Sequence, residues 1–73
     1  MDAVVERIYK LLKEQGKEVK ELAEYIGLTA SKISDWKAGR AKSYYKYITK
    51  IAEFFGVSVD YLTGKDEIKN RSI

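Results

Sequence analysis

The chain has 73 residues, 45% of them hydrophobic and 34% charged, and it carries a formal net charge of +3. This length allows one small domain, and the absence of cysteine and histidine excludes disulfides, thiolate zinc sites and the commonest general base. No apolar run approaches the ~20 residues of a membrane span, and the N-terminus lacks the features of a signal peptide. We therefore expect a soluble cytoplasmic protein with no cofactor, no metal site and no membrane association.

The positive charge is concentrated in one segment. Between Lys32 and Lys50 there are six basic residues and one acidic residue, a net charge of +5, which leaves −2 for the rest of the chain. A basic segment on an otherwise slightly acidic domain is an electrostatic footprint for a polyanion. A solvated lysine-rich face gives the same pattern, so charge alone leaves both interpretations open.

Five glycines divide the chain, which contains no proline. Each follows a segment with helical periodicity, the position where a left-handed residue ends a helix. Residues that cap helix N-termini stand where most of these segments begin, namely Asp2, Thr29, Ser43 and Ser58. No segment alternates with period two for long enough to form a strand. The sequence therefore predicts an all-α domain.

The five helices are predicted over residues 3–15, 18–26, 30–38, 44–55 and 59–63. Apolar residues recur along them at helical spacing and are expected to form the core. These residues are Val4, Ile8, Leu11, Leu12, Val19, Leu22, Ala23, Ile26, Ile33, Trp36, Ile48, Ile51, Ala52, Phe55 and Leu62. The tyrosines at positions 9, 25 and 61 are placed at the edge of the core.

The second and third helices are joined by Gly27-Leu28-Thr29. Two short helices with a three-residue turn that contains glycine form the layout of a helix-turn-helix. Ala23, four residues before the turn glycine, lets the two helices approach, and Ile33, six residues after it, is placed to enter the core. We expect a domain over residues 1–64, with the helix-turn-helix at about 18–38, and a polar, frayed tail or linker over 65–73.

The segment ELAEYIGLTASKISDWKAGR resembles the helix-turn-helix of the lambda-repressor and Cro-like (XRE) family, in which a Leu-Ala pair, a turn glycine, an Ile-Ser pair and a tryptophan recur. KIAEFFGVSVDYLTG resembles the next two helices of that family and RIYKLLKEQG its first. The resemblance spans residues 6–64. It implies a compact five-helix lambda-repressor-like domain that binds double-stranded DNA, usually as a dimer, in the cytoplasm or nucleoid of a bacterial or phage-infected cell.

Three features depart from the family pattern. A threonine-glutamine pair often opens the second helix of the family, where the glutamine helps to bind DNA, but this chain has Glu18 and Val19 there. Ser43 stands where the family often has proline. The third helix has no glutamine or arginine near its start, so its readout of DNA is expected to be unusual or modest.

One side of the third helix is free when Ile33 and Trp36 face the core. Such a helix can enter the major groove, with its N-terminal residues deepest. Asp35 can accept from cytosine N4 or pair with Lys32 or Arg40, and we favour the intramolecular pair. Trp36 is interpreted as a core residue and not as a stacking platform. The predicted base-contacting residues are Ala30, Ser31, Lys32, Ser34 and Asp35.

Basic residues alternate with tyrosines in the segment GRAKSYYKYITK. If Ser43 caps the fourth helix, the free N–H groups there attract a phosphate, and basic side chains and tyrosine hydroxyls are common phosphate donors. The alternative is that Tyr44 and Tyr47 pack on the first helix or on a partner subunit. By resemblance, this loop lies along the DNA backbone. The predicted phosphate-contacting residues are Thr29, Lys37, Arg40, Lys42, Ser43, Tyr44, Tyr45 and Lys46.

Three functions are weighed. The leading hypothesis is a sequence-specific transcriptional regulator, a repressor of phage or mobile-element type that binds a pseudo-palindromic operator as a homodimer. The alternative is a protein-binding module, such as an antitoxin or the partner of an anti-repressor, whose basic face meets a regulatory protein. An enzyme is not expected, because the chain lacks histidine, cysteine and a glycine-rich phosphate loop. Apolar surface for a dimer is sought in Val57, Val59, Tyr61, Ile68 and Ile73.

Overall fold

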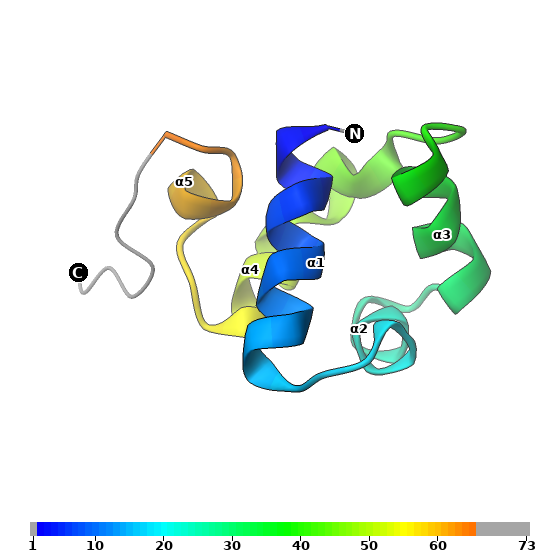
Figure 1. Ribbon diagram of the computed structural model, residues 1–73, viewed down its shortest axis with the longest axis horizontal. Coiled ribbons are helices and arrows are strands. Elements are labelled where there is room, and N and C mark those ends of the chain that lie inside the picture. Colours follow the sequence, from blue (N-terminus) through cyan, green and yellow to red (C-terminus); the bar gives the residue numbers. More distant parts are fainter. Residues whose placement is uncertain (1, 66–73) are drawn as a thin grey trace.

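Helices account for the architecture of residues 2–65, the part of the chain that the computed structural model describes (Figure 1). In chain order the elements are α1 (Ala3–Gln15), α2 (Val19–Ile26), α3 (Ala30–Ala38), the 3₁₀ helix η1 (Ser43–Tyr47), α4 (Ile48–Phe55) and α5 (Val59–Leu62). These residues form no strand, so the predicted all-α class with five α-helices is confirmed. Apart from Lys65, the predicted tail lies outside the described residues.

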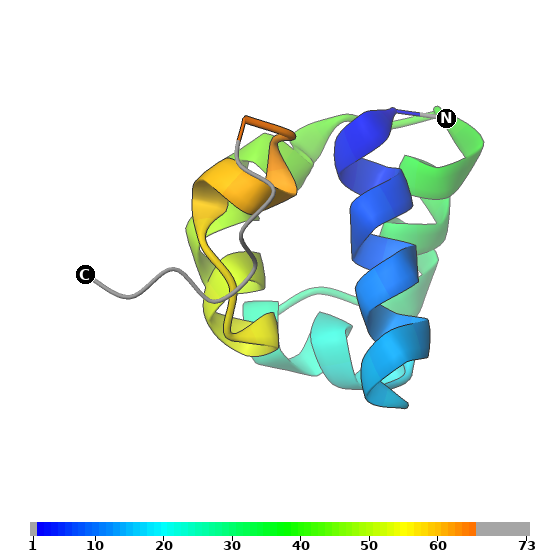
Figure 2. The same ribbon diagram turned by 60° about the vertical axis from the view of Figure 1, so that its left-hand side comes forward.

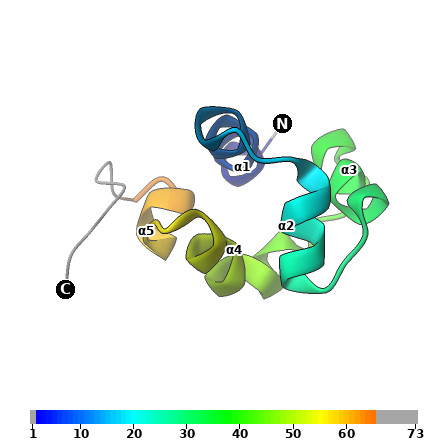
Figure 3. The same cartoon turned by 90° about the horizontal axis from the view of Figure 1, so that it is seen from below.

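Four of the α-helices are arranged as an arc, and α1 lies on its inner side. Figure 3 shows α5, α4, α2 and α3 following one another around α1. Figure 2, turned from the first view, places α1 opposite α4 and α5. The core fills the space between α1 and the arc, where each helix buries its apolar side.

The core matches most of the predicted inward positions. Val5 was not predicted and is fully buried, because α1 lies inside the arc and meets neighbours on more than one side. Val19 and Ile48, which were predicted to face inward, are only half-buried. The buried residues are Val4, Val5, Ile8, Leu11, Leu12, Leu22, Ala23, Ile26, Ile33, Trp36, Tyr44, Ile51, Ala52, Phe55, Tyr61 and Leu62.

Side-chain hydrogen bonds form at both ends of α1, within the first turn at its N-terminus and with α4 at its C-terminus. Asp2 Oδ1 accepts a 2.9 Å hydrogen bond from the backbone N–H of Val4, which satisfies one of the free donors of the first turn. At the other end, Gln15 Nε2 donates to the carbonyl oxygen of Phe55 at 2.9 Å and Lys17 Nζ donates to that of Phe54 at 3.1 Å. The turn between α1 and α2 therefore caps the C-terminus of α4, where a cation also complements the helix dipole.

The single helix predicted over residues 44–55 is wrong in its first turn. Residues Ser43–Tyr47 form η1, and the α-helix begins only at Ile48. Ser43 does not cap an α-helix; it is the first residue of η1, and its hydroxyl accepts a 2.9 Å hydrogen bond from Trp36 Nε1. Tyr44, the next residue, is buried against the same indole, with ring centroids 5.8 Å apart. Contacts with α3 thus set the conformation at this point of the chain.

Candidate nucleic-acid interface

The turn between α2 and α3 sets the position of α3. Gly27 ends α2 with φ of +79°, a left-handed conformation that glycine adopts without steric cost. Thr29 Oγ1 then accepts from the backbone N–H of Lys32 at 3.3 Å and caps α3. Ile33 is fully buried and Trp36 is 2% exposed, so the rotation of α3 about its axis is fixed and Trp36 is the core residue that was predicted.

The opposite side of α3 is open to solvent. Ala30, Ser31, Lys32 and Ser34 are all exposed, and Asp35 is half-buried. Ser31 and Asp35 are four residues apart and therefore share the side that faces away from Ile33 and Trp36. The face carries two hydroxyls, a methyl, an ammonium and a carboxylate, which are groups that can read base edges in a major groove.

Asp35 pairs with Arg40, the residue that follows the C-terminal glycine of α3. Arg40 Nε lies 3.1 Å and Nη2 lies 3.0 Å from Asp35 Oδ1. The intramolecular pair favoured from the sequence is therefore formed, with Arg40 and not with Lys32. Gly39, at φ of +81°, reverses the chain so that the Arg40 N–H also donates to the Asp35 carbonyl oxygen at 2.9 Å.

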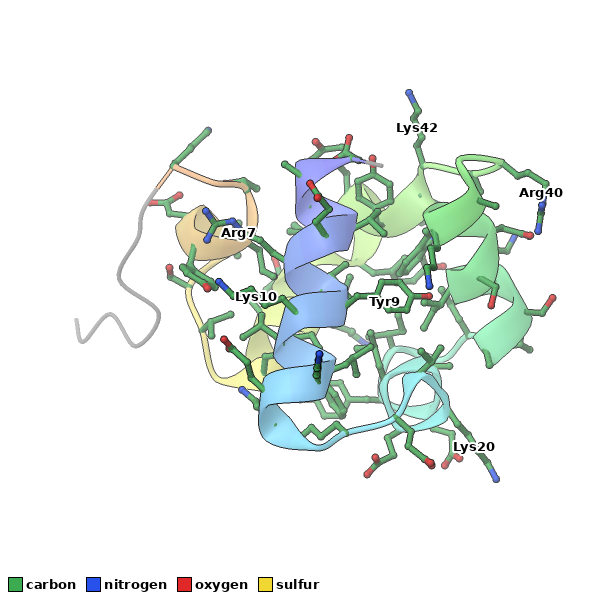
Figure 4. All side chains as sticks on the ribbon, viewed as in Figure 1. Arg7, Tyr9, Lys10, Lys20, Arg40 and Lys42 are labelled. Atoms are coloured by element: carbon green, nitrogen blue, oxygen red, sulfur yellow. The ribbon has the colours of Figure 1, made fainter. Side chains whose placement is uncertain are left out.

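Basic side chains extend from the loop that follows α3. Arg40 and Lys42 are exposed, and Figure 4 shows both pointing into solvent from this loop. Tyr45 and Lys46 on η1 are exposed as well, with Tyr45 at 54%. The structure thus brings one end of the free face of α3 next to a group of exposed basic and tyrosine side chains, which are kinds of side chain that commonly contact phosphate.

Tyr44 and Ser43 do not fit their predicted phosphate-binding roles. Tyr44 is 1% exposed, and burial, together with the nearby Asp2 carboxylate, raises the pKa of its hydroxyl to about 12. The hydroxyl faces Asp2 and lowers the pKa of that carboxyl, although the contact falls short of full hydrogen-bond geometry. The packing alternative holds for Tyr44, and the half-buried Ser43 hydroxyl accepts a hydrogen bond from Trp36.

Lys37, which is exposed, is the one predicted phosphate-binding residue within α3, and its side chain contacts α1. It comes four residues after Ile33, and its Nζ lies 4.9 Å from the ring centroid of Tyr9 on α1. Figure 4 shows the Tyr9 side chain extending from α1 toward α3, and burial raises the pKa of this tyrosine. Lys37 therefore bridges the two helices, which is a structural role that its charge alone did not indicate.

The N-terminus of α2 has its own carboxylates instead of a phosphate-binding group. The Glu18 N–H donates to Glu21 Oε2 at 2.7 Å, so a free donor at this helix end is satisfied internally. Lys20, labelled in Figure 4, is exposed on the same helix.

Other kinds of site have little support within residues 2–65. No group of three or more acidic, cysteine or histidine side chains in this range is placed to hold a metal ion. In the same range, no helix is both long and apolar enough to cross a membrane.

A pocket of about 330 Å³ opens between the start of α1 and the end of α3. It is lined by Asp2, Trp36, Lys37, Ala38, Gly39, Ala41, Lys42 and Tyr44.

These features define an all-helical domain in which one side of α3, the second helix of the helix-turn-helix, is exposed to solvent beside a basic loop. A family model described as helix-turn-helix matches residues 8–62. The chain therefore belongs to the helix-turn-helix family of lambda-repressor and Cro-like (XRE) DNA-binding domains, as the sequence motifs indicated.

One curated relative gives a further comparison. The chain is 30% identical over 57 residues to the SPbeta prophage-derived uncharacterized HTH-type transcriptional regulator YonR of Bacillus subtilis strain 168. The match covers 78% of this chain and 53% of YonR, so the chain spans about half the length of this relative. No solved structure matches the chain significantly.

Proposed function

We propose that this chain is the DNA-binding domain of a transcriptional repressor and that α3 reads an operator from the major groove. The observation that carries the proposal is the polar face of α3, which Ile33 and Trp36 hold outward next to the exposed Arg40 and Lys42. A helix fits the groove, which is ~12 Å wide. The prophage origin of YonR supports a repressor of phage or mobile-element type.

The exposed side chains near the start of α3 each have a matching partner on DNA. Ala30 suits a thymine methyl group, Ser31 and Ser34 can donate to or accept from base edges, and Lys32 can donate to guanine O6 or N7. These residues lie in the N-terminal half of α3, which enters the groove most deeply. They carry the sequence preference in this proposal.

A second group of side chains binds the DNA backbone. Arg40, Lys42, Tyr45 and Lys46 are exposed near the end of α3, and Thr29 keeps a hydroxyl hydrogen for a phosphate because its oxygen serves as the acceptor of the cap. Tyr44 is left out because it is buried, Ser43 because it is half-buried and bonded to Trp36, and Lys37 because its ammonium lies over the Tyr9 ring, although the residue is exposed. Such contacts position the protein without reading sequence.

The repressor acts as a dimer in this proposal. One short reading helix gives limited specificity, and two such helices on half-sites ~34 Å apart would produce a pseudo-palindromic operator. Of the apolar residues considered for the dimer, Val57 and Val59 are half-buried, whereas Tyr61 is 3% exposed and belongs to the core. Ile68 and Ile73 lie outside the described residues.

The proposal is tested by selecting bound duplexes from a random DNA pool at about 150 mM salt, where non-specific binding is already weakened. The expected result is a consensus with two-fold symmetry. The matched control is a Ser31→Ala, Lys32→Ala double variant, which changes two exposed side chains and should lose the consensus while keeping the fold. No enrichment with the unaltered chain would contradict the proposal and favour binding to an acidic regulatory protein.

A further inference from the structure

The pair formed by Asp35 and Arg40 is only partly satisfied. Both contacts of Arg40, from Nε at 3.1 Å and from Nη2 at 3.0 Å, end on the same carboxylate oxygen, Oδ1. Arg40 therefore leaves Asp35 Oδ2 available as an acceptor. A guanidinium has five N–H donors, and two contacts leave the others available. The side chains are 68% exposed for Arg40 and 33% exposed for Asp35, so both groups can meet a ligand.

The pair lies where α3 and the basic loop meet. Asp35 is four residues after Ser31 and shares its outward side. The loop is anchored on the same residue, because the N–H groups of Arg40 and Ala41 donate to the Asp35 carbonyl oxygen at 2.9 and 3.3 Å. The carboxylate on the outward side of α3 and the guanidinium on the loop are thus held next to each other.

The charge of Asp35 makes its approach to DNA depend on Arg40. A bare carboxylate among phosphates is repelled, whereas a carboxylate that is neutralised by Arg40 is not. The major groove offers two amino donors, cytosine N4 and adenine N6. Adenine places the N7 acceptor beside its amino group, which opposes a carboxylate, and cytosine does not. Asp35 Oδ2 therefore matches cytosine.

We propose that Asp35 selects a cytosine in the operator and that Arg40 both positions this carboxylate and binds a neighbouring phosphate. The inference rests on the proposed function of the domain. It adds that Asp35 reads a cytosine and that this reading depends on the contact of Arg40 with the DNA backbone. Base selection at this position then requires Arg40, although Arg40 touches no base.

The test measures the affinity of four variants for the selected operator and for duplexes with each base pair replaced. Asp35→Ala should remove an approximately tenfold preference for cytosine at one position of each half-site. Asp35→Asn should move the preference at that position to adenine, because an amide suits N6 and N7 together. Arg40→Lys keeps the positive charge but lacks the rigid fork of the guanidinium. It should bind the backbone almost normally and lose the cytosine preference.

Lys42→Ala is the matched control, since it removes from the same loop a cation that is not paired with Asp35 and whose positive charge acts on Asp2 instead. It should weaken binding to all duplexes and keep the cytosine preference. An Arg40→Lys variant that retains this preference would overturn the coupling, and an Asp35→Ala variant with every preference intact would overturn the role of Asp35. Absence of any sequence preference in the unaltered chain would instead remove the proposed function together with the inference. Circular dichroism of each variant checks that the fold is retained.

Discussion

Trp36 on α3 donates a 2.9 Å hydrogen bond from Nε1 to the hydroxyl of Ser43, the first residue of η1. The indole is 2% exposed, so this is the bond through which a buried donor is satisfied. It joins the helix proposed to read DNA to the segment that carries the exposed Tyr45 and Lys46. The distance between the two proposed groups of DNA contacts is therefore set within the protein.

Replacing Ser43 with alanine should lower the free energy of unfolding by about 1–3 kcal/mol, the cost of leaving a buried donor without a partner. Urea denaturation followed by circular dichroism measures the change. Ser34→Ala is the matched control, because Ser34 is exposed and its loss should stay within about 0.5 kcal/mol. Equal effects of the two substitutions would show that the indole bond contributes little to stability.

Tyr44 should be the tyrosine that ionises last. Its pKa is raised to about 12 from the ordinary value of 10.0, so the unfolded chain loses this proton at lower pH than the folded chain. The resulting stabilisation is complete below pH 10 and is lost as the pH rises toward 12. An ultraviolet absorbance titration of tyrosine ionisation measures this directly, and Tyr44→Phe should remove the component with the highest pKa.

Tyr44→Phe and Tyr45→Phe should have different effects on DNA binding. Tyr44→Phe should leave the affinity for DNA unchanged, because its hydroxyl is buried, whereas Tyr45→Phe removes an exposed hydroxyl next to the proposed backbone contacts. A loss of affinity on Tyr44→Phe without a loss of stability would restore the phosphate-binding role that the sequence suggested.

Asp2→Ala should destabilise the domain by about 1 kcal/mol at neutral pH, because it removes the N-cap of α1. The Tyr44 hydroxyl and the Val4 N–H lower the pKa of Asp2 below the ordinary 3.8. Stabilisation by a depressed carboxyl is present above that ordinary value and is lost as the pH falls through the folded-state pKa. The difference between the two proteins should therefore shrink on acidification, as denaturation curves at neutral and acidic pH will show. Asp2→Ser, which keeps a capping oxygen, should retain most of the stability at neutral pH.

The ends of α1, α3 and the turn between α2 and α3 could be predicted from the sequence because they depend on local chemistry. Asp2 and Thr29 cap the helices that follow them, and Gly27 and Gly39 end the preceding helices in left-handed conformations. Periodicity likewise identified most of the core. It missed Val5, since a pattern along one helix does not show how many neighbours surround that helix.

The parts that escaped prediction depend on side-chain contacts between different elements of the fold. The start of the predicted fourth helix failed because Ser43 is engaged by Trp36, and spacing alone gave no signal for that bond. Lys37 looked like any other basic residue until the structure placed it against Tyr9, whose position depends on how α1 crosses α3. The sequence left two possible intramolecular partners for Asp35, Lys32 and Arg40. It also gave no indication that both contacts of Arg40 would be made with Oδ1.

Three lysine substitutions should separate base contacts, backbone contacts and structural cations. Lys42→Ala should weaken binding to all duplexes and reduce the salt slope by about one, as expected for a phosphate contact. Lys32→Ala should instead relax the preference at particular base pairs by about 1–3 kcal/mol. Lys37→Ala should change DNA affinity least, because its ammonium lies against Tyr9. Fluorescence anisotropy titrations of several duplexes at several salt concentrations give the affinity, its salt dependence and the preference among base pairs. The three substitutions remove the same charge, so net charge is matched among them, and a uniform loss of affinity would mean that the protein senses DNA only through its overall charge.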